Sequence, residues 1–104
     1  MFKMHGVVPP MVTPFTEGGE VDTEALTALV RFLREKVHGL FVTGSYGAGP
    51  MMETSERKLV TEIAVLEAAG KIPIIAMVGA PYTRQSVELA RHAESVGATA
   101  VASV

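Results

Sequence analysis

Short apolar runs alternate along the chain with longer segments in which apolar residues recur at helical spacing. The two middle runs are nearly continuous in apolar residues, a pattern typical of strands that are covered on both faces of a sheet. The first run contains Pro9 and Pro10, which cannot donate ladder hydrogen bonds and therefore weaken its assignment as a strand. The pattern nevertheless predicts four strands, over residues 6–13, 40–42, 73–78 and 98–104.

Three helices are predicted between these strands. Asp22, Thr54 and Thr83 are residue types that cap helix N-termini. The first helix is expected to end near His38-Gly39, and glycines are expected to stop the second and third. The predicted apolar faces are Leu26, Leu29, Val30, Leu33 and Val37 in the first helix, Leu59, Val60, Ile63, Leu66 and Ala69 in the second, and Leu89, Ala90, Ala93 and Val96 in the third.

Strands that alternate with amphipathic helices imply right-handed crossovers and a parallel sheet. The predicted fold class is therefore α/β, a parallel βαβαβαβ unit forming the N-terminal half of a (βα)8 barrel. A complete barrel of this kind takes about 250 residues, so residues 1–104 are expected to form a single partial domain. The sequence ends on an apolar strand, whose bare edge complete proteins normally cover, and we expect further elements to follow it.

Composition and charge exclude several classes of function. The net charge is −2, and basic and acidic residues are mixed along the chain with no basic stripe, which argues against a nucleic-acid partner. The sequence has no cysteine, and its three histidines have no metal-ligand spacing, so neither a metal nor another cofactor is expected. The longest apolar stretch is too short to cross a membrane, and no signal-peptide core is visible at the N-terminus. A cytoplasmic protein is predicted.

The candidate chemistry lies in the glycine-rich segment 44–50, directly after the second predicted strand. Ligands of parallel α/β sheets bind beyond the carboxyl ends of the strands. Glycine in such a loop lets backbone N–H groups approach an anion closely. The alternative interpretation is a plain tight turn. The glycine order does not match a dinucleotide or P-loop fingerprint.

Taken in order, the motifs of the chain resemble the dihydrodipicolinate synthase/N-acetylneuraminate lyase family. The resemblance covers essentially the whole sequence, and its specificity lies in the joint order of the motifs. It implies a (βα)8 barrel, usually a homotetramer, in which a lysine forms a Schiff base with pyruvate or another 2-oxo acid. The motifs are Pro10-Met11-Val12-Thr13-Pro14-Phe15, Gly39-Leu40-Phe41-Val42, Gly44-Ser45-Tyr46-Gly47, Ser55-Glu56-Arg57-Lys58, Ile74-Ile75-Ala76 and Gly79.

The resemblance places a 2-oxo acid carboxylate on the loop Gly44, Ser45, Tyr46 and Gly47. Two adjacent hydroxyl residues usually hold it in the family, and they map onto Ser45, which also has a hydroxyl suited to relaying a proton, and Tyr46, which departs from the usual threonine. Ala48 stands where the family often has glutamate, and the segment 47–50 is similar to members that cleave 2-keto-3-deoxy sugar acids.

The family's Schiff-base lysine and catalytic tyrosine lie on later strands than this chain supplies. The resemblance therefore implies that the chain alone is inactive. Lys3, Lys36, Lys58 and Lys71 are expected to be solvated surface charges. Two other functions stay open at this point. One is a non-catalytic half-barrel that associates with itself, and the other is a small-anion-binding module that uses the glycine loop alone.

Overall fold

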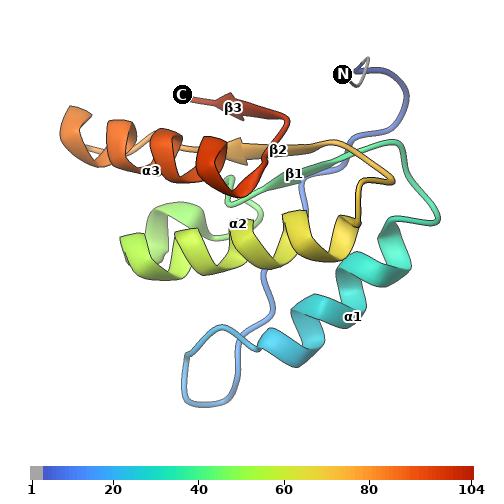
Figure 1. Ribbon diagram of the computed structural model, residues 1–104. Helices are drawn as coiled ribbons and strands as arrows, with labels where there is room; N and C mark the ends of the chain where they lie inside the picture. The colour runs from blue at the N-terminus through green and yellow to red at the C-terminus, as the bar shows by residue number, and fades with distance from the viewer. Residues whose placement is uncertain (1–3) are drawn as a thin grey trace.

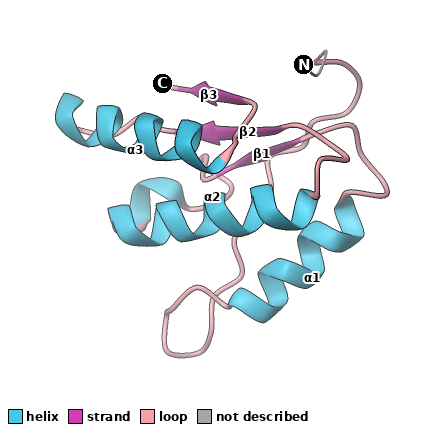
Figure 2. Ribbon diagram, in the orientation of Figure 1, coloured by secondary structure: helices cyan, strands magenta, loops and turns pink. Residues whose placement is uncertain are grey.

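The computed structural model describes residues 4–104, which form a three-stranded parallel sheet and three α-helices. The helices lie along one side of the sheet (Figures 1 and 2). The strand order is β1-β2-β3, so consecutive strands are neighbours. The elements are α1 (Thr23–Leu33), β1 (Leu40–Val42), a short 3-10 helix (Gly49–Met51), α2 (Thr54–Ala68), β2 (Ile74–Met77), α3 (Thr83–Val96) and β3 (Ala100–Ala102).

The sheet register places one buried layer of side chains against the helices. Leu40 pairs with Ile74, and Val42 pairs with Ala76, and all four side chains are buried. Phe41 lies between the two buried residues of β1 and is only half-buried, because successive side chains of a strand point to opposite faces. The face of the sheet that carries the helices therefore holds the core, and the other face is less covered.

The first predicted strand is largely wrong. Residues 6–13 do not form a strand, and only one isolated parallel bridge, between Pro10 and Phe41, joins this segment to β1. The Phe41 N–H donates to the Pro9 carbonyl at 3.0 Å, and the Met11 N–H donates to the Phe41 carbonyl at 2.8 Å. Because Pro9 and Pro10 have no N–H, the segment lies beside β1 without completing a regular ladder.

The other predicted strands are confirmed, although the last is shorter than its apolar run. β3 covers three residues of the predicted seven, at 98–104. The Thr99 N–H donates to the Ile74 carbonyl at 2.8 Å, just before β3 begins. The parallel alternation of strands and helices predicted from the sequence is therefore present for the three strands β1, β2 and β3.

The predicted helix caps are correct at one position out of three. Asp22 caps α1, and its Oδ1 accepts a hydrogen bond from the Ala25 N–H at 3.0 Å. At α2 the cap is Glu53 rather than Thr54, because Glu53 and Glu56 form a capping box in which the Glu56 carboxylate accepts the Glu53 N–H at 2.9 Å. The capping box therefore makes Glu53 the N-cap of α2, one residue before the predicted cap Thr54.

Two other helix boundaries differ from the sequence prediction. Tyr82 precedes α3 in extended conformation, and Thr83 is the first residue of the helix, not its cap. α1 ends at Leu33, and a turn closed by Lys36 N–H and the Leu33 carbonyl at 2.8 Å leads to the strand. Gly97 ends α3 in left-handed conformation, as predicted.

The predicted apolar face of α2 is wrong for its two leucines. Leu66 is 72% exposed and Leu59 is 36% exposed, whereas Val60, Ala64 and Ala68 are buried. α2 packs between α1 and α3 and against the sheet, and the predicted residues Val60 and Ile63 belong to the core or pack against it. The buried side of the helix is therefore rotated away from Leu59 and Leu66, and it also carries Arg57, Thr61, Ala64 and Ala68.

Candidate functional site

The glycine-rich loop leaves the carboxyl end of β1 in a tight left-handed turn. Thr43 and Ala48 have φ angles of 57° and 59°, a conformation that is uncommon for residues other than glycine. Between them, the Ala48 N–H donates to the Ser45 carbonyl at 3.1 Å, and the Gly49 N–H donates to the Gly44 carbonyl at 3.0 Å. The loop therefore folds back on its own beginning.

Two glycines of this loop are required by close backbone contacts. A Cβ atom on Gly49 would lie 1.8 Å from the Thr43 carbonyl oxygen. A Cβ atom on Gly47 would lie 2.9 Å from the Met11 carbonyl oxygen. Since both obstructing atoms belong to the backbone, no side-chain rotation relieves the overlap. The glycine content of the loop therefore has a packing cause, as the tight-turn interpretation expected.

The same turn leaves a run of consecutive N–H groups without a protein partner. Within residues 4–104, no backbone N–H from Thr43 to Gly47 donates a hydrogen bond. Ser45 is exposed, Tyr46 is 75% exposed, and Gly44 and Gly47 are buried beneath them. Adjacent free N–H groups at the carboxyl end of a parallel strand form an arrangement suited to a carboxylate or a phosphate.

Thr13 fixes the far side of the loop, a role that the sequence did not reveal. Its buried hydroxyl donates a 2.6 Å hydrogen bond to the Gly47 carbonyl, across 34 residues of sequence. Thr13 follows the extended segment that bridges to β1. Its place in a motif of the resembled family was visible, but a hydroxyl-to-carbonyl contact between distant segments leaves no periodic signal in a sequence.

Replacing Thr13 by valine is expected to destabilise the chain by about 1–3 kcal/mol. Valine has the same shape but no donor, so the Gly47 carbonyl loses its buried partner. Urea unfolding of Thr13→Val, compared with Thr13→Ser, measures this difference. Serine keeps the hydroxyl and is expected to retain most of the stability, and an equal loss in both variants would show that the hydrogen bond is not the cause.

Several charged side chains away from the loop form contacts at the surface. Lys58 pairs with Glu88 at 2.6 Å, and Lys71 pairs with Glu35 at 2.5 Å. The Nε2 atom of His92 lies 2.9 Å from a Glu62 carboxylate oxygen on the neighbouring helix. In the part of the chain that the structure describes, no cluster of three or more metal-ligating side chains occurs. Within the same residues, no helix combines the length and apolarity needed to cross a bilayer.

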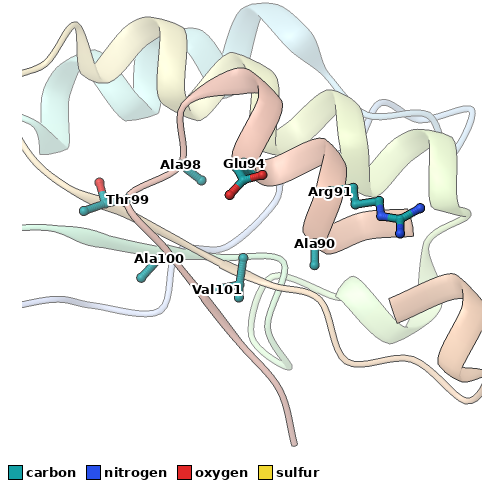
Figure 3. Close-up of a pocket in the computed structure, with 7 residues that line it drawn as sticks. All are labelled: Ala90, Arg91, Glu94, Ala98, Thr99, Ala100 and Val101. Atoms are coloured by element: carbon teal, nitrogen blue, oxygen red, sulfur yellow. The ribbon is translucent and has the colours of Figure 1, made fainter. Parts of the chain in front are cut away.

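Among the described residues, three surface hollows lie outside the loop. The smallest, of about 320 Å³, lies along α1, and the other two border α3. One, of about 340 Å³, is bordered by α3 and the segment entering β3 (Figure 3). The other, of about 540 Å³, lies between the starts of α2 and α3 and includes Tyr82, which is 73% exposed. None of the three is lined by residues 44–47. Ser45 and Tyr46 are instead exposed at the carboxyl end of β1.

A comparison with protein families finds that residues 3–104 match the Dihydrodipicolinate synthetase family. The chain is 41% identical over 102 residues to the 4-hydroxy-tetrahydrodipicolinate synthase of Rhizobium meliloti, covering 97% of this chain and 34% of that protein. It is 35% identical over 105 residues to a probable 2-dehydro-3-deoxy-D-pentonate aldolase of Escherichia coli, covering 100% of this chain and 35% of that protein. The chain thus spans about a third of the length of these relatives.

The fold is also similar to that of solved structures. A prophage protein of the dihydrodipicolinic acid synthase family from Escherichia coli K12, solved in complex with pyruvate, matches with a TM-score of 0.90 and 31% identity. The match covers 94% of this chain and 33% of that chain. The three parallel strands and three helices described above therefore correspond to one part of a larger structure.

Proposed function

This chain belongs to the dihydrodipicolinate synthetase family, and we propose that it is the N-terminal portion of a class I lyase or aldolase acting on pyruvate or a related 2-oxo acid. The observation that carries the proposal is the pair of free N–H groups of the exposed residues Ser45 and Tyr46, at the carboxyl end of β1. A similar structure of the same family was solved in complex with pyruvate, whose carboxylate is the kind of anion such donors bind.

In this proposal the loop binds the carboxylate and does not perform the covalent step. The N–H groups of Ser45 and Tyr46 donate to the carboxylate oxygens, and Gly44 and Gly47 permit the turn that brings them together. The Ser45 hydroxyl belongs to an exposed residue, and in this proposal it carries a proton to or from the reacting carbons. The Schiff-base lysine comes from a later strand of the barrel, so residues 1–104 alone are inactive.

The substrate that we favour is a 2-keto-3-deoxy sugar acid. Its support is the segment Gly47-Ala48-Gly49-Pro50 together with the relative named as a probable 2-dehydro-3-deoxy-D-pentonate aldolase. In the cleavage, the lysine amine condenses with the C2 carbonyl and releases water. The C4 hydroxyl then loses its proton as the C3–C4 bond breaks, which releases the aldehyde, and the electron pair of that bond forms an enamine with the lysine nitrogen. The enamine takes up a proton at C3, and water hydrolyses the resulting C=N bond, which releases pyruvate and restores the lysine amine.

We further propose that the protein works in the cytoplasm as a homo-oligomer, a tetramer by family resemblance. Three large side chains near the carboxyl ends of the strands support an interface there, since Tyr46, Met51 and Tyr82 are 75%, 88% and 73% exposed. Aromatic and methionine side chains are enriched where proteins associate.

Trapping with borohydride tests the proposal. The protein encoded by the natural reading frame that contains this sequence is expressed and incubated with pyruvate and borohydride. Its intact mass is then measured by mass spectrometry. Reduction of the C=N bond fixes one pyruvate-derived group on the lysine, so the expected result is a single adduct that requires both reagents. A folded product that gains no adduct would overturn the proposed activity. Release of pyruvate from 2-dehydro-3-deoxy-D-pentonate then decides the substrate class.

The free N–H groups favour one second candidate, a small-anion-binding module without covalent chemistry. Inorganic phosphate distinguishes the two, because such a module would bind phosphate as tightly as pyruvate. The proposed lyase loop, in contrast, is expected to prefer a planar carboxylate beside a ketone.

A further inference from the structure

Arg57 is a buried charge without a counter-ion. It lies in the first turns of α2 and is only 3% exposed. Among residues 4–104, no carboxylate lies within ion-pair distance of its guanidinium. Arginine is almost never fully buried unless it is paired, and burial lowers the pKa of this side chain. Such a costly placement calls for a structural or functional reason.

The partners of the guanidinium are two backbone carbonyls at the end of β2. One terminal nitrogen donates to the Met77 carbonyl at 2.7 Å, and the other donates to the Gly79 carbonyl at 3.0 Å. The Arg57 Nε has no partner within the described residues. The planar fork therefore fixes the carboxyl end of β2 in space, which a flexible lysine ammonium does less well.

The Thr43 hydroxyl lies 3.0 Å from the Met77 carbonyl oxygen and 2.7 Å from the Val42 carbonyl oxygen, and its single proton is shared between these two acceptors. The Met77 carbonyl would otherwise continue the parallel ladder. The Leu40 N–H donates to the Pro73 carbonyl, and because ladder bonds repeat every second residue, the Gly44 N–H would reach the Met77 carbonyl. No such bond forms.

The hydroxyl and the guanidinium thus replace the ladder at the point where β1 ends. Thr43 adopts its left-handed conformation there, with φ of 57°. The chain turns away from the sheet, and the N–H groups of Ser45 and Tyr46 stay free.

We infer that Arg57 is a positioning residue for the loop Gly44–Gly47: by holding the Met77 carbonyl, it keeps Thr43 in the turn that presents the loop N–H groups to an anionic ligand. This inference rests on the proposed function for the identity of the ligand, a 2-oxo acid carboxylate. Its structural part, the dependence of the loop conformation on Arg57, stands independently of the ligand.

The test uses amide NMR spectra of the protein expressed from the natural reading frame that contains this sequence, with pyruvate as the probe. Arg57→Met, which keeps the apolar stem, is expected to shift the Ser45 and Tyr46 amides in the ligand-free protein. It is also expected to weaken pyruvate binding roughly tenfold. The amide shifts of α1 and α3 are expected to stay unchanged. Arg57→Lys keeps the charge but not the fork and is expected to restore only part of the affinity. Lys58→Met removes a neighbouring charge that pairs with Glu88, and it is expected to change neither quantity.

Each outcome decides a separate statement. If wild-type amides do not respond to pyruvate, the proposed ligand is wrong, and the ligand-free shifts still decide the role of Arg57. If Arg57→Met leaves the Ser45 and Tyr46 amides in place, the inference is overturned. Should that variant fail to fold, Thr43→Ala removes the second donor to the same carbonyl. It is expected to move the same amides, and unchanged loop amides in Thr43→Ala would equally overturn the inference.

Discussion

Gly49→Ala is expected to destabilise the chain by at least about 3 kcal/mol, the upper end of the usual cost of overpacking. The new Cβ would lie 1.8 Å from the Thr43 carbonyl oxygen and 2.6 Å from its carbonyl carbon. Both atoms belong to the backbone of the turn, so the overlap is relieved only by moving the loop. Urea unfolding measures the stability, and the amide spectrum measures the displacement of Ser45 and Tyr46.

Gly18→Ala is the matched control for this substitution. Its Cβ would meet only the Thr16 hydroxyl, at 3.7 Å, which is an ordinary contact. The expected change in stability is within about 0.5 kcal/mol. A Gly49→Ala variant as stable as Gly18→Ala, with unmoved loop amides, would show that the loop does not pack on Thr43 as described.

The parts of the fold that follow from local periodicity were predicted correctly. The apolar runs at β1 and β2 and the helical spacing in α1 and α3 each depend on neighbouring residues. The placement of the glycine loop at the carboxyl end of β1 follows from the order of the elements alone. The family resemblance, confirmed by the match to residues 3–104, depends on the joint order of several such segments.

The errors arose where distant segments compete for the same backbone groups. The segment with Pro9 and Pro10 has the composition of a strand but too few donors for a ladder. The contacts that shape the loop, from Thr13 to the Gly47 carbonyl and from Arg57 to the Met77 carbonyl, join segments 34 and 20 residues apart. Side-chain bonds to distant carbonyls have no periodic signature, so these parts of the site required the structure.

The apolar face of α2 was mispredicted for a different reason. Where apolar residues lie on more than one side of a helix, helical periodicity does not show which side faces the core. Leu66 was predicted in the core and is 72% exposed, whereas Leu26, on α1, is fully buried. Leu26→Ala is therefore expected to cost about 2–5 kcal/mol, from lost burial and the cavity left behind.

Leu66→Ala makes the same chemical change on a helix surface and is expected to cost less than about 0.5 kcal/mol. Because both substitutions replace leucine by alanine within a helix, differences in helix propensity cancel between them. Urea unfolding of the two variants compares a buried leucine with an exposed one. If Leu26→Ala unfolds the chain without urea while Leu66→Ala stays folded, the conclusion is the same. Equal losses of stability in the two variants would mean that α2 turns Leu66 toward the core. Because Arg57 lies on the same helix, its placement at the end of β2 would then be wrong as well.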